Sequence, residues 1–156
     1  MKTLLILVGK TTDKHFQAGI NDYVERISHY MPFELVTIPE LKNTKNLSEE
    51  QQKTAEGELI LKQLQPSDTV VLLDEHGHEF RSIELARWLE QKRNTARRLV
   101  FIIGGPYGFS PAVYSRANEQ LSLSRLTFSH QMIRLVFTEQ IYRACTIIKG
   151  EPYHHE

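Results

Sequence analysis

The sequence of 156 residues predicts an α/β fold, with a mostly parallel sheet that carries helices on both faces. Short, almost wholly apolar segments alternate with longer segments whose apolar residues recur every three or four positions. The apolar segment 99–103 is followed directly by glycines and a proline. This pattern is typical of a buried parallel strand that ends at a ligand-binding turn.

The first half of the chain contains three predicted strands and two predicted helices. The strands are short apolar runs, and we expect them at 4–8, 33–38 and 69–73. Asp13 is suited to cap a helix, because the apolar residues after it recur at spacings of three and four. Ser48 and Gln51 form a capping box that predicts a second helix through Leu64. A polar loop over 42–46 joins the second strand to this helix.

The second half continues the same alternation. Serines mark the starts of three further helices, at Ser82, Ser110 and Ser129. Pro111 supports the second of these, since proline favours the first turn of a helix. Residues 119–128 alternate apolar and hydroxyl side chains over their middle, which predicts a short strand that runs into a loop. We expect the last helix to run from about 130 to 149 and to end at Gly150.

Composition restricts the class of protein. Apolar residues make up 40% of the chain, which is enough for a single domain over 1–156 to bury a core. A formal net charge of zero argues against a protein that holds nucleic acid by bulk attraction, so any RNA contact must use local patches. Cys145 is the only cysteine, which excludes an internal disulfide and suits a reducing compartment. The apolar run 4–8 is too short for a secretion signal, and no stretch approaches a membrane span.

Two nucleotide-binding motifs are nearly present and fail on inspection. Gly9-Lys10-Thr11 resembles the end of a phosphate-binding P-loop, but that motif requires a glycine where Leu4 stands. The dinucleotide-binding pattern G-x-G-x-x-G requires a glycine where Pro106 stands. We therefore expect neither a P-loop hydrolase nor a dinucleotide-dependent enzyme.

Histidine pairs offer a possible metal site. The pairs are His76 with His78, and His154 with His155. With one cysteine, and without a known spacing of carboxylates and histidines, both pairs are interpreted as surface histidines, and we expect no metal.

Three stretches in the second half carry a resemblance to a known family. They are the apolar strand that ends in Gly104–Gly108, the segment LSLSRLTFSHQMIRLVFTEQIYRA at 121–144, and the terminal PYHHE at 152–156. Together they resemble the SPOUT superfamily of knotted RNA methyltransferases, and within it the small enzymes that modify large-subunit ribosomal RNA. The resemblance covers essentially the whole chain and is strongest from Leu99 onward.

The resemblance implies an activity that composition and periodicity do not reveal. It implies transfer of a methyl group from S-adenosylmethionine to N3 of a pseudouridine in 23S ribosomal RNA, within assembled ribosomes of the cytoplasm. It also implies a homodimer and a C-terminal trefoil knot. Ordinary topology rules exclude a knot, so this feature is an expectation from the resemblance alone.

The resemblance also implies three cofactor-binding segments. They contain Leu73, then Gly104, Gly105 and Pro106, then Leu123, Ser124, Arg125, Leu126, Thr127 and Phe128. This set suits the ligand, because an adenine needs a flat apolar slot and the methionine end needs room close to bare backbone. Without the resemblance, Leu73 and Leu123 read equally well as ordinary core leucines.

A weakly acidic imide nitrogen calls for a base or a nearby positive charge. We assign catalytic roles to His130, Arg143 and His154, and RNA contacts to Arg134, Tyr142 and Tyr153. The histidines can accept a proton near neutral pH, whereas the arginines can hold phosphate or stabilise an imide anion. The rings of the C-terminal residues can stack on a flipped base. The alternative for His130 is a helix-start residue that is bonded locally.

Two questions remain open at the level of sequence. Apolar residues cover a broad arc of the last helix, which is explained either by a partner subunit or by complete burial within one chain. A non-enzymatic, ribosome-associated RNA-binding factor is the alternative function, and it predicts no cofactor pocket.

Overall fold

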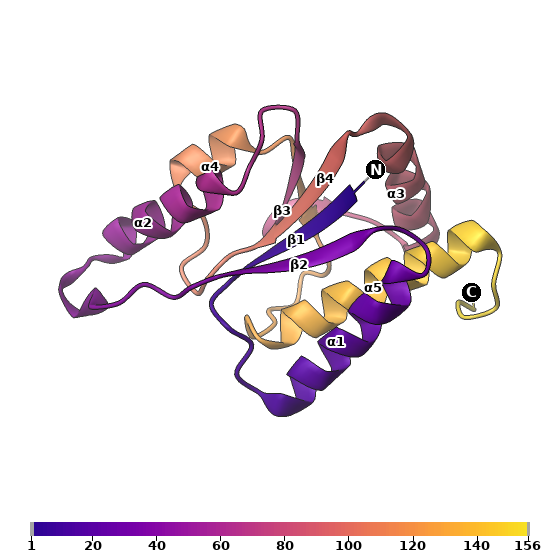
Figure 1. The fold of residues 1–156 in the computed structure, drawn as a ribbon, viewed down its shortest axis with the longest axis horizontal. Helices are drawn as coiled ribbons and strands as arrows, with labels where there is room; N and C mark the ends of the chain where they lie inside the picture. The colour runs from indigo at the N-terminus through magenta and orange to yellow at the C-terminus, as the bar shows by residue number, and fades with distance from the viewer. Residues whose placement is uncertain (1, 156) are drawn as a thin grey trace.

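A computed structural model describes residues 2–155 and places a five-stranded parallel sheet between two layers of helices (Figure 1). The strand order is β2-β1-β4-β3-β5, and every pairing between neighbours is parallel. The strands are β1 (Lys2–Val8), β2 (Phe33–Ile38), β3 (Thr69–Glu79), β4 (Arg98–Ile103) and β5 (Glu119–Ser122). The predicted mostly parallel sheet is confirmed.

Helices cover both faces of the sheet, as expected for an α/β fold. They are α1 (Lys14–Ser28), α2 (Glu49–Lys62), α3 (Ser82–Thr95), α4 (Pro111–Arg116) and α5 (Met132–Lys149). Figure 1 shows α1, α3 and α5 on one side of the sheet and α2 and α4 on the other. The long helix α5 lies beside α1 and also packs against α3.

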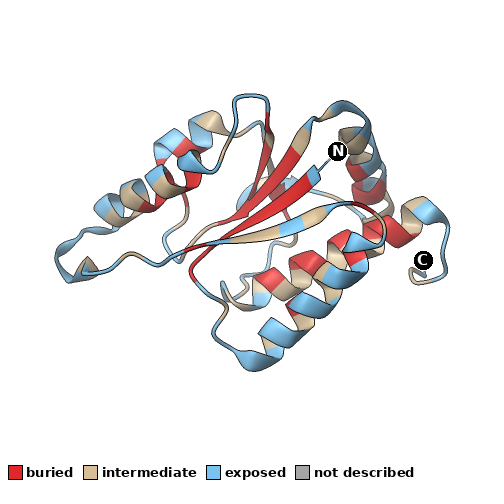
Figure 2. Ribbon diagram, viewed as in Figure 1, coloured by how far each residue is buried: buried red, intermediate tan, exposed pale blue. Residues whose placement is uncertain are grey.

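The alternation of side chains along each strand divides the core into two layers. In β1, Leu5 and Leu7 join the cluster that packs under α1, α3 and α5, whereas Leu4 and Ile6 join the cluster under α2 and α4. All four are at most 3% exposed. Figure 2 shows buried residues concentrated on the central strands. Burial of such side chains contributes about 25 cal/mol per Å² of apolar surface and supplies most of the stability of the fold.

Four of the predicted local signals for helix ends are confirmed. The Asp13 side chain accepts hydrogen bonds from the first backbone N–H groups of α1. Ser48 forms the predicted capping box of α2. Ser110 caps α4, with Pro111 at the first helical position. Gly150 closes α5 with a φ of 75°, a conformation that favours glycine.

Two boundaries differ from the sequence prediction. β3 extends to Glu79 instead of ending at Leu73, because the chain bulges out after Leu73 and returns at His78 to pair with β5. Both Leu73 and His78 are paired with Leu121 across this irregularity. Helix α5 begins at Met132 rather than near residue 130, since Ser129 caps a preceding turn by accepting a hydrogen bond from the Met132 N–H.

The loop between β2 and α2 contains a short 3₁₀ turn at Thr44–Asn46, within the stretch predicted to be a polar loop. Among residues 2–155, none of the helices combines the length and apolarity that a membrane crossing requires. A trefoil knot stays an expectation from the family resemblance.

Candidate functional site

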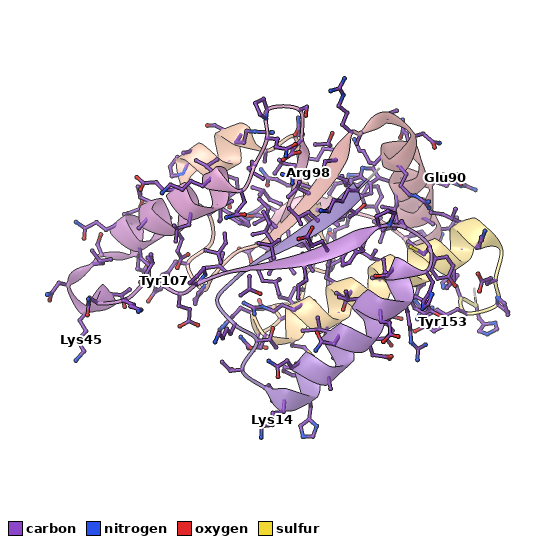
Figure 3. All side chains as sticks on the ribbon, in the orientation of Figure 1. Lys14, Lys45, Glu90, Arg98, Tyr107 and Tyr153 are labelled. Atoms are coloured by element: carbon purple, nitrogen blue, oxygen red, sulfur yellow. The ribbon has the colours of Figure 1, made fainter. Side chains whose placement is uncertain are left out.

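A cavity of about 600 Å³ opens where β3, β4 and β5 end. Its walls come mainly from three segments, 73–76, 103–109 and 121–130. Because the carboxyl ends of parallel strands meet at one edge of a sheet, segments far apart in sequence converge here. Tyr107, labelled in Figure 3, lies on the second of these segments.

The second segment is a tight turn. The Gly108 N–H donates a hydrogen bond to the carbonyl of Gly105 at 3.2 Å, and the two residues form a β-bridge across Pro106 and Tyr107. Gly108 has a φ of 82°, so a side chain at this position is strained. Tyr107 is consequently presented at the tip of the turn, where it is 44% exposed.

The glycines at the start of this turn serve packing inside the protein. A Cβ at Gly104 would stand 2.9 Å from the buried ring of Phe109, and a Cβ at Gly105 would stand 3.0 Å from the carboxylate of Glu56. Side chains at these positions therefore first meet the α2 and α4 layer.

The third segment is held by its own serines. Ser122 Oγ donates to the carbonyl of Ser124, and Ser124 Oγ accepts from the N–H of Leu126, both at 3.0 Å. The Leu126 side chain lies at the mouth of the cavity, and the residue is 75% exposed. Arg125 points away from the cavity and pairs with Glu79 at 3.3 Å.

Nine of the predicted cofactor-binding residues line the cavity: Leu73, Gly104, Gly105, Pro106, Leu123, Ser124, Leu126, Thr127 and Phe128. Arg125 is the exception. His130 also lines the cavity, just before α5. The structure thus brings these residues to one place, while their contacts with a ligand stay a prediction.

Sequence reasoning missed a polar pair on the wall of this cavity. The Asp74 carboxylate accepts hydrogen bonds from the N–H of His76 at 2.9 Å and from the hydroxyl of Tyr114. Burial and the negative charge of Asp74 raise the pKa of Tyr114 to about 12, so the phenol remains a donor near neutral pH. Asp74 follows a predicted strand directly, which is a usable signal. No sequence signal marks Tyr114, because it lies on α4 and is brought to the cavity only by the fold.

The fixed charges on the cavity wall are acidic. Among residues 2–155, the lining contains Asp74 and Glu75 but neither lysine nor arginine. The remaining polar side chains of the wall are hydroxyls and the imidazoles of His76 and His130. Near neutral pH, such a cavity favours a cationic ligand over an anion such as phosphate.

The other predicted catalytic residues lie in a second group near the end of α5. We call this group the C-terminal cluster: Glu139, Tyr142, Arg143, Tyr153 and His154. Arg143 donates to Glu139 at 2.6 Å and contacts Nδ1 of His154 at 3.1 Å, and Tyr153 donates to Glu139 at 3.0 Å. The Arg143 guanidinium lies 4.8 Å from the centre of the Tyr153 ring.

The contact with Arg143 determines the tautomer of the neutral His154 ring. Arginine only donates hydrogen bonds, so Nδ1 of His154 accepts and the neutral ring carries its proton on Nε2. Nε2 is buried and has no hydrogen-bond partner among residues 2–155. Burial, with hydrogen bonds involving Tyr23 and Glu139, raises the pKa of Tyr153 well above its usual range, so this phenol is a donor as well.

Comparison with known proteins decides the family. The family described as "Predicted SPOUT methyltransferase" matches residues 1–154. The chain belongs to the SPOUT methyltransferase family. Proteins named Ribosomal RNA large subunit methyltransferase H from Phocaeicola vulgatus and Bacteroides fragilis are each 64% identical to it over the full length of both chains. The protein of the same name from Christiangramia forsetii is 56% identical over 99% of each chain.

The two groups of candidate residues in this SPOUT methyltransferase are far apart. His130 precedes α5 and Arg143 lies near its end, a separation of about 20 Å at the rise of an α-helix. Figure 3 shows the same separation, with Tyr107 and Tyr153 toward opposite ends of the molecule. Within one chain, His130 therefore cannot act on the same atom as Arg143 or His154.

Arg134 occupies a third position, inside the protein. Its guanidinium donates to the carbonyls of Val8 and Gly9 at 2.8 and 3.0 Å and to the Thr11 hydroxyl at 3.0 Å. The residue is 0% exposed, and burial lowers its pKa. This placement gives the predicted RNA contact no support, because the arginine binds the end of β1 instead of facing solvent.

The fold covers a large part of the apolar arc of α5. Phe137, Ile141 and Ala144 are buried in the core layer that α5 shares with α1 and α3. Ile147 and Ile148 stay partly buried at its edge. Burial within one chain therefore explains the middle of the arc, and its end has surface left for a partner.

The histidine pairs do not assemble into a metal centre in the part of the chain that the structure describes. No group of three or more histidine, cysteine, aspartate or glutamate side chains in residues 2–155 is placed to hold a metal ion. His76 instead lies beside acidic neighbours, with its Nδ1 3.3 Å from the Asp74 carboxylate.

Proposed function

We propose that this protein transfers a methyl group from S-adenosylmethionine to N3 of a pseudouridine in the 23S ribosomal RNA of the large subunit. Family membership and full-length relatives named as methyltransferases of this RNA support the reaction. The observation that carries the assignment to a site is the cavity in which the three predicted cofactor segments converge. Its acidic wall and apolar floor suit a sulfonium with an adenine ring.

The residues of the cavity would position the donor. When bound, S-adenosylmethionine supplies an activated methyl: the carbon–sulfur bond breaks as the bond to N3 forms, and the sulfur keeps the bonding pair and becomes neutral. Leu73, Leu123 and Phe128 provide apolar walls for a flat ring. The serines and the bare turn at Gly105 offer hydroxyl and backbone groups at the same edge. Alignment of this kind is the main contribution a protein makes to a displacement with a good leaving group.

The C-terminal cluster would serve the acceptor. Arg143 is a donor that can hold a phosphate or stabilise negative charge on the imide as its N3 proton departs to a base or to solvent, and His154 orients it through Nδ1. Tyr142 and Tyr153 pack edge-to-face at 4.8 Å and present aromatic surface suitable for stacking on a base. The roles for Arg143, Tyr142 and Tyr153 are the ones the sequence predicts. His154 differs, because the sequence predicts a proton acceptor and the contact with Arg143 leaves the proton of the neutral ring on its buried Nε2.

A homodimer would join the two groups. Because α5 separates the cavity from the C-terminal cluster of its own chain, a complete site needs the cluster of a second copy. The partly buried end of the α5 arc supports this arrangement. Since the substrate is a ribosome, we also infer that the protein works in the cytoplasm.

Ribosomal RNA from a strain that lacks the protein tests the activity. Mass spectrometry is expected to show loss of one methyl mark on a pseudouridine of 23S RNA, and a plasmid copy of the gene restores it. An unchanged methylation pattern contradicts the proposal. The alternative of a non-enzymatic ribosome factor predicts no binding of S-adenosylmethionine, so calorimetry on the purified protein separates the two functions.

Mixing two inactive variants tests the shared site. A variant defective in the cavity and a variant defective in the C-terminal cluster are expected to regain about a quarter of wild-type activity when their subunits exchange, because half the dimers are mixed and each contains one intact site. No recovery, despite exchange shown by mass spectrometry, would contradict a site built from two chains.

A further inference from the structure

We propose that Asp74, held in place by Tyr114, gives the cavity its preference for the cationic methyl donor over the neutral product, S-adenosylhomocysteine. This inference rests on the proposed function and concerns one residue that the family resemblance does not assign. Methyl transfer removes the positive charge from sulfur, so the two ligands differ by one charge and one methyl group. A fixed negative charge on the wall therefore distinguishes them.

The position of Asp74 is the first support for this role. The residue directly follows Leu73, at the point where the chain leaves its pairing with β4 and bulges away from the sheet. Its side chain is 10% exposed and lies on the wall of the cavity. Screening by solvent is weak for a charge so far removed from water, so its field extends into the cavity.

Tyr114 fixes the direction of the carboxylate. Its hydroxyl bonds one carboxylate oxygen of Asp74, and the N–H of His76 bonds the other. The ring of Tyr114 packs edge-to-face against Phe109 at 5.8 Å, and Phe109 is buried against Gly104. A chain of contacts therefore runs from the floor of the cavity through Phe109 and Tyr114 to Asp74.

Among the described residues of the lining, no lysine or arginine neutralises the charge of Asp74. The lining contains Glu75 as the other charged side chain, but this carboxylate is 73% exposed and is screened by solvent. His76 is 81% exposed, with Nδ1 3.3 Å from Asp74. Arg125 is directed to Glu79, outside the lining. Among the described residues of the wall, Asp74 is thus the one shielded fixed charge.

The test is calorimetric titration of the full-length wild-type protein and the D74N variant with S-adenosylmethionine and S-adenosylhomocysteine. D74N keeps the shape of the side chain and removes the charge. We expect its affinity for the donor to fall roughly tenfold and its affinity for the product to stay within about twofold, as the loss of one attraction at intermediate dielectric implies. E79Q is the matched control, because it removes a carboxylate that lies outside the lining.

An equal loss of affinity for both ligands would overturn the inference, because it would show that Asp74 binds an uncharged part common to both, such as ribose hydroxyls. Unchanged affinities would overturn it as well. If the wild-type protein binds neither ligand, the proposed function itself fails, which is a different result from either of these.

A second variant keeps the inference testable if D74N does not fold. Y114F keeps the ring that packs against Phe109 and removes the hydroxyl that bonds the Asp74 carboxylate. We expect its preference for donor over product to narrow, with the affinity for the product as the internal reference. A preference equal to that of the wild-type protein would contradict the role of a carboxylate held by Tyr114.

Discussion

The cavity and the C-terminal cluster differ in both charge and origin. The cavity wall is made from the ends of three strands and carries acidic side chains, with neither lysine nor arginine among the described residues that line it. The C-terminal cluster is made from the end of α5 and the residues after it, and contains Arg143 and His154. The cavity suits a cation, whereas in the cluster the charge of Arg143 is paired with Glu139, so the cluster offers hydrogen-bond donors and aromatic rings instead of a net charge.

The cavity and the C-terminal cluster lie at opposite ends of α5. Substitutions in the cavity and in the cluster should produce different losses, since α5 separates the two regions within one chain. Donor affinity reports on the cavity, and methylation at saturating donor reports on the cluster.

Replacement of Arg143 by alanine should abolish methylation and spare donor binding. The change removes a charged donor that contacts both Glu139 and His154, and we expect the rate to fall about 100-fold or more. Transfer of tritiated methyl groups to ribosomal RNA measures the rate, and calorimetry measures donor affinity. Full activity in R143A would remove this arginine from the site, and a parallel loss of donor affinity would break the division between the regions.

Replacement of Gly104 by leucine should have the opposite effect and weaken the binding of the donor. A side chain here meets the ring of Phe109, so the turn must shift and the cavity must change shape. We expect donor affinity to fall by about 30-fold or more. G104A is the graded control, because a Cβ alone stands 2.9 Å from Phe109 and requires a smaller shift. Unchanged affinity in G104L, with the fold intact by circular dichroism, would contradict this placement of the donor.

Replacement of Arg134 by methionine tests the buried arginine. The variant leaves the carbonyls of Val8 and Gly9 without their donor, and we expect the free energy of unfolding to fall by about 2 kcal/mol. Urea denaturation measures the loss. Unchanged stability together with weaker RNA binding would contradict this structural role. It would show that Arg134 contacts RNA, as the sequence predicts.

The smallest effect concerns Glu56, which lies under the cavity floor at Gly105. Burial, together with the negative charge of Glu40, raises the pKa of the Glu56 carboxyl. The folded chain therefore holds the proton of Glu56 more tightly than the unfolded chain. The protonated carboxyl stabilises the folded state at low pH, and this stabilisation is lost as pH rises through the folded pKa. E56Q should be slightly more stable than wild type at pH 7, and the difference should shrink below pH ~4. A less stable E56Q at pH 7 would contradict this reading.

Local signals were sufficient to predict most of the fold. The caps at Asp13, Ser48 and Ser110 depend on side chains that bond the backbone within three residues, so the sequence contains all of the information. The extension of β3 to Glu79 was missed because it depends on pairing with β5, which is distant in sequence. Non-local pairing leaves no trace in the periodicity of one segment.

The site was predicted in part, for the same reason. Composition and the family resemblance predict both the glycine turn and the segment 123–128 as parts of a site. In the structure both segments line one cavity. Tyr114 was missed because its bond to Asp74 spans 40 residues. The sequence predicts an RNA contact for Arg134, but helical spacing alone does not show that its side chain reaches the end of β1.

A crystal structure of the protein grown with S-adenosylmethionine tests the central claim most directly. Electron density for the donor is expected in the cavity between Leu73, the turn at Gly104 and the segment 123–128, with the sulfonium on the side of Asp74. Density at another place on the protein, or a cavity closed by its own side chains while the donor binds in solution, would contradict the account.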